Sequence, residues 1–114
     1  MVECLFCKIA AGEISSDIVD QDEEIVAFRD INPKAPTHIL IIPRQHIESI
    51  AHVSDEQAAL IGKLFCKARD LARREGIEDS GYRLVFNVGR GAGQEVFHVH
   101  LHLLGGRSFT WPPG

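Results

Sequence analysis

The sequence contains no apolar run close to the roughly 18 residues that a membrane-spanning helix requires. Its first residues, Met1-Val2-Glu3-Cys4, lack the basic start and the apolar stretch of a signal peptide. Cysteine is scarce, and three cysteines leave one unpaired in any disulfide scheme, which argues against a disulfide framework. Together these absences predict a cytoplasmic protein without membrane contact.

An excess of positive charge is also lacking. The formal net charge is −4 at pH 7, which argues against a broad electrostatic surface for nucleic acid. A small phosphate ligand is still compatible, because it responds to local donors rather than to net charge. The 114 residues show neither an internal repeat nor a linker-like segment, and this length suits one core. We therefore predict a single domain over residues 1–114.

Two short stretches in the first half of the chain indicate strands. Residues 25–29 suggest one strand, closed by the turn-like residues 30–33. Residues 38–42 form a continuous apolar run that ends at Pro43. Such a run is typical of a strand that is covered on both faces.

From Ser54 the apolar residues recur at the i, i+3, i+4 spacing of an amphipathic helix. Ser54 and Gln57 have the spacing of a capping box, and Gly76 is suited to a left-handed C-terminal cap. A step of about 100° per residue predicts an exposed face opposite the apolar stripe. This face comprises Lys63, Cys66, Lys67, Asp70 and Arg73.

The last third of the chain indicates two more strands around a glycine-rich loop. Residues 82–87 predict a strand with Tyr82, Leu84 and Phe86 on one face, and residues 96–104 predict the last strand. Residues 89–93 must form a loop. Strands joined by short turns, with one long helix inserted, predict an α+β domain with a mostly antiparallel sheet.

The most informative stretch is residues 98–104, in which three histidines alternate with apolar residues. Side chains alternate across a strand, so His98, His100 and His102 should share one face. One imidazole could then attack a substrate while its neighbours hold an anion. Two other interpretations remain: a half-exposed strand whose polar positions are histidine, and a metal site formed by the triplet. Three consecutive ligands on one strand suit a tetrahedral metal poorly.

This strand matches the histidine triad motif, His-φ-His-φ-His-φ-φ with φ apolar, at every position. The chain resembles the Hint branch of the histidine triad family over nearly its whole length. The family implies an α+β fold with about five mostly antiparallel strands, one long helix, a short N-terminal helix, and sheets joined in a symmetric homodimer. The stretches that carry the resemblance are Cys4 to Ile9, Ala27-Phe28-Arg29-Asp30-Ile31, Ala35-Pro36-Thr37-His38, Ile42-Pro43, Gly105-Gly106-Arg107 and Trp111-Pro112-Pro113-Gly114.

The resemblance implies that His100 is the nucleophile, which attacks the α-phosphorus and becomes transiently nucleotidylated. An imidazole suits this role because its pKa near 6.5 leaves much of it as a free base at neutral pH. Covalent catalysis also divides one difficult displacement into two easier ones. His98 and His102 flank the nucleophile, and His102 would donate to a phosphate oxygen. His38 resembles the histidine that supports the triad's protonation state, although a purely structural role suits it equally.

The resemblance also implies contacts to a purine nucleotide such as an AMP or GMP derivative. Asp30 would accept the ribose hydroxyls, although an Asp there could simply serve the following turn. The purine walls would be Phe6, Ile9, Phe28 and Ile31, which could equally be core residues.

Residues 87–95 are the candidate phosphate loop, because glycines let backbone amides approach an anion closely. The contacts would come from Asn87, Gly93, Gln94 and Glu95, although a glycine-rich turn is often only a turn. Glu95 stands where the animal Hint proteins have serine. The donor that protonates the leaving amine is therefore left open by the sequence.

The pair Cys4 and Cys7 has the Cys-x-x-Cys spacing that supplies two zinc ligands. A redox role suits it poorly, because its two middle residues are bulky and apolar. In zinc-containing relatives the other two ligands resemble His46 and His98. We therefore expect a structural zinc at Cys4, Cys7, His46 and His98, with an empty site as the alternative, and no catalytic metal.

The resemblance thus implies a hydrolase that cleaves the phosphorus–nitrogen bond of purine nucleoside phosphoramidates, such as AMP joined to an amine or to lysine. One alternative is hydrolysis of dinucleoside polyphosphates, as in the fragile histidine triad branch. Another is a nucleotide-binding, zinc-containing interaction module without turnover. The terminal residues 111–114 favour the Hint branch, and the intact His100 argues against a pure binding module.

Overall fold

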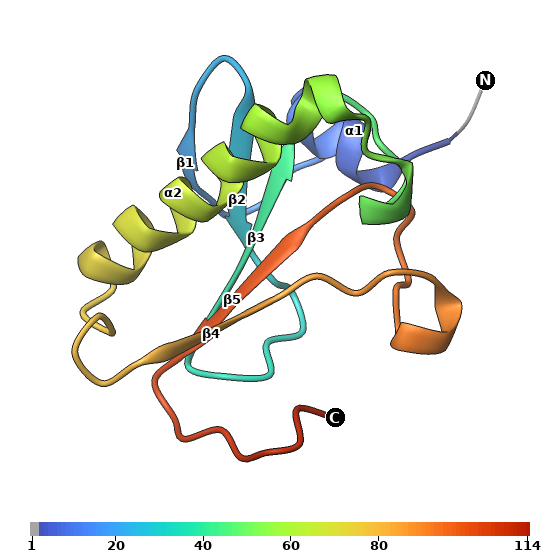
Figure 1. Ribbon diagram of the computed structural model, residues 1–114. Coiled ribbons are helices and arrows are strands. Elements are labelled where there is room, and N and C mark those ends of the chain that lie inside the picture. The colour runs from blue at the N-terminus through green and yellow to red at the C-terminus, as the bar shows by residue number, and fades with distance from the viewer. Residues whose placement is uncertain (1–2) are drawn as a thin grey trace.

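The computed structural model describes residues 3–114 and contains one antiparallel sheet with two helices (Figure 1). The strands lie in the order β1-β2-β3-β5-β4, and every neighbouring pair is antiparallel. This confirms the predicted α+β class with five strands, one long helix and a short N-terminal helix. The elements are α1 (Leu5–Ala10), β1 (Ile18–Gln21), β2 (Ile25–Arg29), β3 (Thr37–Pro43), α2 (Ala58–Arg74), β4 (Tyr82–Val85) and β5 (Leu101–Gly105).

The central strand β3 is buried at every residue, as its continuous apolar run predicts. Because side chains alternate along a strand, Ile39 and Ile41 pack into one cluster with the apolar stripe of α2. Leu40 and Ile42 point to the other face and pack with α1. The two helices therefore cover opposite faces of the sheet (Figure 1).

The capping box and the C-terminal glycine of the long helix lie where the sequence predicts, although α2 itself begins only at Ala58. A single 3₁₀ turn, Asp55–Gln57, leads into α2, and Gln57 Oε1 accepts a hydrogen bond from the Ser54 N–H at 2.9 Å, completing the capping box. Gly76 follows the helix with a φ of +73°, a left-handed value that favours glycine. Within residues 3–114, no helix combines the length and the apolar character needed to cross a membrane.

The predicted last strand over residues 96–104 is wrong at its start, because β5 begins at Leu101. Ile41 pairs with Leu101, so a longer ladder would place Pro43 opposite residue 99. Proline has no N–H to donate to a ladder. The carbonyl of Pro43 accepts a hydrogen bond from the ring of His98 at 2.7 Å instead.

The fourth strand is also shorter than predicted, since it ends at Val85 rather than at residue 87. The predicted facing is confirmed, because Tyr82, Leu84 and Phe86 all pack against the cluster on the α2 side. The loop that follows contains a 3₁₀ turn, Arg90–Ala92. It carries the chain from the edge of the sheet to the α1 side, where the histidines lie.

Candidate active site

A cavity of about 460 Å³ lies beside α1, between the glycine-rich loop and the turn after β2. It brings together all of the predicted nucleotide-binding residues except Gln94, and it also includes His38. Its lining is apolar at one side, where α1 and β2 meet, and carries histidines and polar groups at the other. The lining residues are Leu5, Phe6, Ile9, Ile14, Ser15, Ser16, Phe28, Arg29, Asp30, Ile31, Asn32, Lys34, His38, Leu40, Asn87, Gly93, Glu95, Val96, His100 and His102.

The apolar side of the cavity is built by two aromatic rings. Phe6 of α1 stands edge-on to Phe28 of β2, with 5.4 Å between ring centroids, and both are buried. Phe6 also meets the ring of His100 edge-on at 5.1 Å. Ile31 at the rim is fully exposed, and an exposed apolar side chain beside a cavity is a surface that a planar ligand can cover.

The ring of His100 is fixed by the backbone two residues earlier. Its Nδ1 donates to the carbonyl of His98 at 2.8 Å, so the neutral ring keeps a lone pair on Nε2. Burial lowers the pKa of His100, which outweighs the raising effects of the hydrogen bond and of Asp30. The site therefore holds a neutral imidazole with a free nitrogen at neutral pH.

A relay of hydrogen bonds fixes the other two rings in the cavity. The backbone N–H of Lys34 donates to His38 Nδ1 at 3.0 Å, so the proton of neutral His38 is on Nε2. That Nε2–H donates to His102 Nδ1 at 2.9 Å, which places the proton of His102 on Nε2. Within the described residues 3–114, His102 Nε2 is buried and has no partner. The relay thus ends in an unpaired N–H donor.

The same burial keeps these two rings neutral. It lowers the pKa of His38, and it lowers the pKa of His102 to about 4, with further lowering by the neighbouring His100 and His38. A neutral His102 has one N–H to offer a ligand. An anion is the acceptor that would gain most from it.

Asp30 serves two purposes at once. Its Oδ1 accepts from the N–H of Asn32 at 2.8 Å, which is the turn-forming role that the sequence left open. Its Oδ2 lies 3.5 Å from His38 Nε2, and the side chain is only 19% exposed. The second oxygen thus faces the cavity side of the turn, where hydroxyl groups of a ligand could donate to it.

Gln94 lies beneath the glycine-rich loop and does not line the cavity. Its Oε1 accepts from the Gly89 N–H at 2.9 Å, and its Nε2 donates to the carbonyls of Glu48 and Val96 at 2.8 and 3.1 Å. Only 3% of its surface is exposed. The side chain therefore holds the loop in place, while Gly93, at a φ of +90°, reaches the cavity.

The four predicted metal ligands form a cluster at the N-terminal end of α1. One ligand atom from each lies within 4.8 Å of the others. His98 Nδ1 is 3.3 Å from Cys4 Sγ and 3.5 Å from Cys7 Sγ, and His46 Nδ1 is 3.4 Å from Cys7 Sγ. Ligands around a tetrahedral zinc lie roughly 3.3–3.8 Å apart, from Zn–N and Zn–S bonds of about 2.0 and 2.3 Å.

The protonation of the cluster also suits a metal. Because His98 Nε2 donates to the carbonyl of Pro43, its Nδ1 presents a lone pair to the two thiols. Burial and the adjacent Cys4 thiol raise the pKa of Cys7 to about 11. A cation would favour the thiolate instead. The donor set and its spacing therefore fit zinc.

A second group of potential ligands, Asp30, His38 and His102, also lies within 4.8 Å. Here the hydrogen bonds argue against a metal. His38 Nδ1 already accepts from the Lys34 N–H, so its Nε2 carries a proton and has no lone pair to offer. These three side chains therefore belong to the cavity, and their hydrogen bonds fix which ring nitrogens carry the protons.

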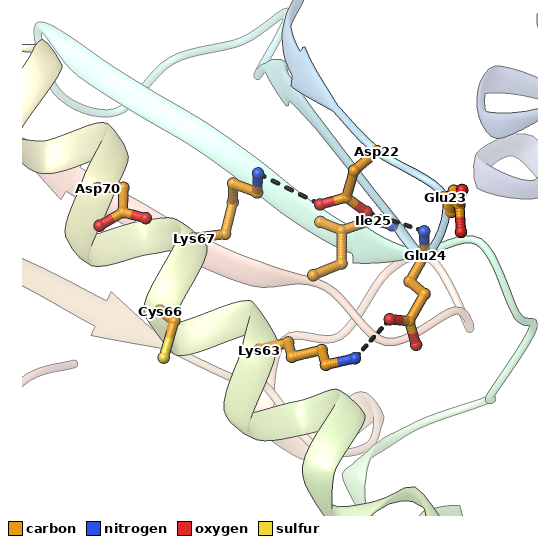
Figure 2. A pocket seen from close by; sticks show the side chains of 8 residues that line it. All are labelled: Asp22, Glu23, Glu24, Ile25, Lys63, Cys66, Lys67 and Asp70. Carbon is orange, nitrogen blue, oxygen red and sulfur yellow. Dashed lines mark hydrogen bonds and ion pairs between the residues drawn. The ribbon is translucent and has the colours of Figure 1, made fainter.

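A separate hollow of about 520 Å³ lies between α2 and the β1–β2 turn (Figure 2). Its charged side chains largely satisfy one another, since Lys67 pairs with Asp22 at 3.3 Å and Lys63 pairs with Glu24. Cys66 is exposed at its edge, as the helical pattern predicts. The hollow is lined by Asp22, Glu23, Glu24, Ile25, Lys63, Cys66, Lys67 and Asp70, and it has none of the features of the histidine cavity.

Several residues that line the cavity were not predicted from the sequence. Leu40 could have been found, because a strand period of two puts it on the face of His38. Ser15, Ser16 and Lys34 come from irregular segments. No periodic pattern indicates that those segments meet the histidines.

Comparisons with known proteins agree with this geometry. The HIT domain family model matches residues 11–109. The chain is 52% identical over 105 residues to the purine nucleoside phosphoramidase of Escherichia coli (strain K12), which covers 92% of this chain and 88% of that protein. It is 48% identical over 112 residues to the 14 kDa zinc-binding protein of Zea mays, covering 96% and 87%. A crystal structure of a HIT family hydrolase from Legionella pneumophila Philadelphia 1 superposes with a TM-score of 0.97 at 58% identity, covering 98% and 100%.

Proposed function

Because the chain belongs to the histidine triad (HIT) family, we propose that it hydrolyses the phosphorus–nitrogen bond of purine nucleoside 5′-phosphoramidates. The substrate would be AMP or GMP joined to an amine, and the products would be the nucleotide and the free amine. One observation carries the proposal: the cavity holds a neutral His100 with a free Nε2 beside the unpaired N–H donor of His102. These are the two groups that nucleophilic attack on a phosphorus requires.

In the proposed reaction, His100 Nε2 attacks the α-phosphorus and forms a P–N bond to the ring. The bond to the substrate amine breaks, and the amine takes a proton from solvent as it leaves. Water then attacks the phosphorus of the nucleotidyl-histidine, the P–N bond to the ring breaks, and the nucleotide leaves as the proton of the water passes to solvent and His100 becomes neutral again. The hydrogen bond from Nδ1 to the His98 carbonyl favours this sequence, because it stabilises the positive charge that forms on the ring.

The remaining contacts follow from the placement of the lining residues. His102 Nε2–H would donate to a phosphate oxygen, and Asn87 with the amides near Gly93 would complete the phosphate site. The free Oδ2 of Asp30 would accept from the ribose hydroxyls. The purine would lie against Phe6, Ile9, Phe28 and Ile31.

The experiment that tests the function is turnover of adenosine 5′-phosphoramidate and of a dinucleoside polyphosphate by the wild-type protein, measured with and without a chelator. We expect cleavage of the phosphoramidate, and a higher kcat/KM for it than for the dinucleotide. A preference for the dinucleotide would place the protein with the polyphosphate hydrolases. Binding of AMP without any turnover would leave only a nucleotide-binding role.

We also propose that the cluster of Cys4, Cys7, His46 and His98 holds a structural zinc. The metal would cross-link the start of α1 to the segments that carry His46 and His98. Protein purified without chelator should contain about one zinc per chain. The Cys7→Ser variant should lose it, and Cys66→Ser should keep it, because Cys66 is the exposed cysteine outside the cluster. Elemental analysis measures the zinc content per chain, and equal zinc in the two variants would exclude this cluster as the zinc site.

We further propose a homodimer in which the sheets of two copies join. Strand β4 is at one edge of the sheet. Phe65 of α2 and Val88, just beyond β4, are exposed apolar residues. Light scattering should give a mass near twice the 12.6 kDa of one chain, and a single-chain mass would contradict this.

A further inference from the structure

Helix α1 contributes residues both to the metal-binding cluster and to the cavity. Cys4 caps its start, with Sγ accepting from the Cys7 N–H at 3.3 Å, so both thiols belong to its first turn. Phe6, between them, points to the cavity and contacts Phe28 and His100. Phe6 also meets the ring of the cluster's His98 edge-on at 6.1 Å, so the same short segment carries two of the ligands and part of the cavity wall.

This helix has little stability of its own. It spans six residues, far fewer than the roughly 12–15 that an isolated helix needs to persist in water. Its C-terminal end is tied to the chain by Arg44, whose Nη1 donates to the Ala10 carbonyl at 2.7 Å. At its N-terminal end, Cys4 and Phe6 pack in the apolar cluster below the helix, and the two thiols contact His46 and His98.

The segments that carry the partners of the thiols are held by hydrogen bonds outside the cluster. The N–H of Val99 donates to the carbonyl of Ile47 at 2.7 Å, which joins the segments that carry His98 and His46. The ring of His98 is fully buried and held by the Pro43 carbonyl. A metal bound to all four ligands would thus attach this short helix to segments that are held together by the Val99–Ile47 hydrogen bond and tied to β3 through Pro43.

We propose that the cluster of Cys4, Cys7, His46 and His98 is a clamp that sets the affinity of the cavity for nucleotide, by holding Phe6 and Ile9 in the position that a purine contacts. The inference rests on the proposed function, since it takes the cavity to bind a purine nucleotide. Without metal, α1 would be ordered for only part of the time. Nucleotide affinity then falls in proportion to the fraction of molecules in the competent state.

The test compares His46→Asn with His52→Asn. Both histidines are exposed and neither lines the cavity, but only His46 belongs to the cluster. His46→Asn should retain less than about a tenth of an equivalent of zinc and bind AMP about tenfold more weakly, as expected if the competent fraction falls to about one tenth. His52→Asn should keep the zinc content and AMP affinity of the wild type. Calorimetric titration with AMP gives both affinities without turnover.

Hydrogen exchange of the amides of residues 5–10, measured without AMP, reports on the clamp independently of nucleotide. We expect faster exchange in His46→Asn and in chelator-stripped wild type, and slow exchange in His52→Asn. Addition of Zn²⁺ to the stripped wild type should restore both slow exchange and tight AMP binding.

Two results would overturn the clamp. One is an AMP affinity in zinc-free protein equal to that of the zinc-loaded wild type, and the other is unchanged exchange over residues 5–10. If the zinc-loaded wild type itself does not bind AMP, the proposed function fails. The exchange rates then still decide whether the metal orders α1.

Discussion

The His100→Gln protein should cleave adenosine 5′-phosphoramidate at least about 10³-fold more slowly than the wild type, because removal of a covalent nucleophile typically has effects of this size or larger. Of the ring nitrogens in the cavity, His100 Nε2 is the one whose lone pair is not already engaged. A glutamine amide has no comparable basic nitrogen and cannot form the nucleotidyl intermediate. Steady-state rates of the two proteins at equal zinc content provide the comparison.

Two controls separate chemistry from binding. His100→Gln should still bind AMP, since the proposed phosphate, ribose and purine contacts come from other residues. His52→Gln, at an exposed histidine outside the cavity, should keep the full rate. A rate for His100→Gln within tenfold of the wild type would mean that the nucleophile is another group.

The histidine alternation illustrates what the sequence could predict. The hydrogen-bonded strand starts only at Leu101, yet His98 and His100 both lie on the side of Phe6. Val99 and Leu101 pack into the opposite cluster. An extended chain alternates its side chains whether or not it is hydrogen-bonded to a neighbouring strand. The predicted common face of the histidines was therefore correct, although the predicted start of the strand was not.

The sequence could not predict which nitrogen of each histidine ring faces which partner. His98 turns its Nδ1 toward the cysteines because the Pro43 carbonyl, 55 residues earlier, binds its Nε2. His38 and His102 share a proton order that begins at the backbone of Lys34. Residue type indicates that an imidazole can bind, donate or attack. The choice depends on partners that only the folded chain brings together.

The role of Gln94 also could not be predicted from the sequence. Its position in a glycine-rich loop indicates a polar group near a phosphate, and the sequence offers no reason to exclude a direct contact. In the structure both ends of its amide are engaged by the loop and by the carbonyl of Glu48. Its proposed role therefore becomes support of the loop rather than contact with the nucleotide.

This role predicts a large effect for Gln94→Leu, which keeps the approximate volume but removes every hydrogen bond. The Gly89 N–H and the carbonyls of Glu48 and Val96 would lose their partners. An unpaired buried polar group destabilises by about 1–3 kcal/mol, so we expect the free energy of unfolding to fall by about 2–4 kcal/mol. Urea denaturation, with Gln45→Leu at an exposed glutamine as the matched control, measures this difference.

The loss of activity should exceed what unfolding explains. Gly93 and Asn87 reach the cavity from the two ends of the loop that Gln94 supports, and a displacement of about 1 Å in a catalytic site can lower the rate by about 10²-fold. We therefore expect kcat/KM for the phosphoramidate to fall by about 10²-fold at temperatures where the variant is fully folded. Gln45→Leu should retain the wild-type value. A Gln94→Leu protein of unchanged stability and rate would show that the loop keeps its shape without this side chain, and the phosphate site would then rest on the glycine backbone alone.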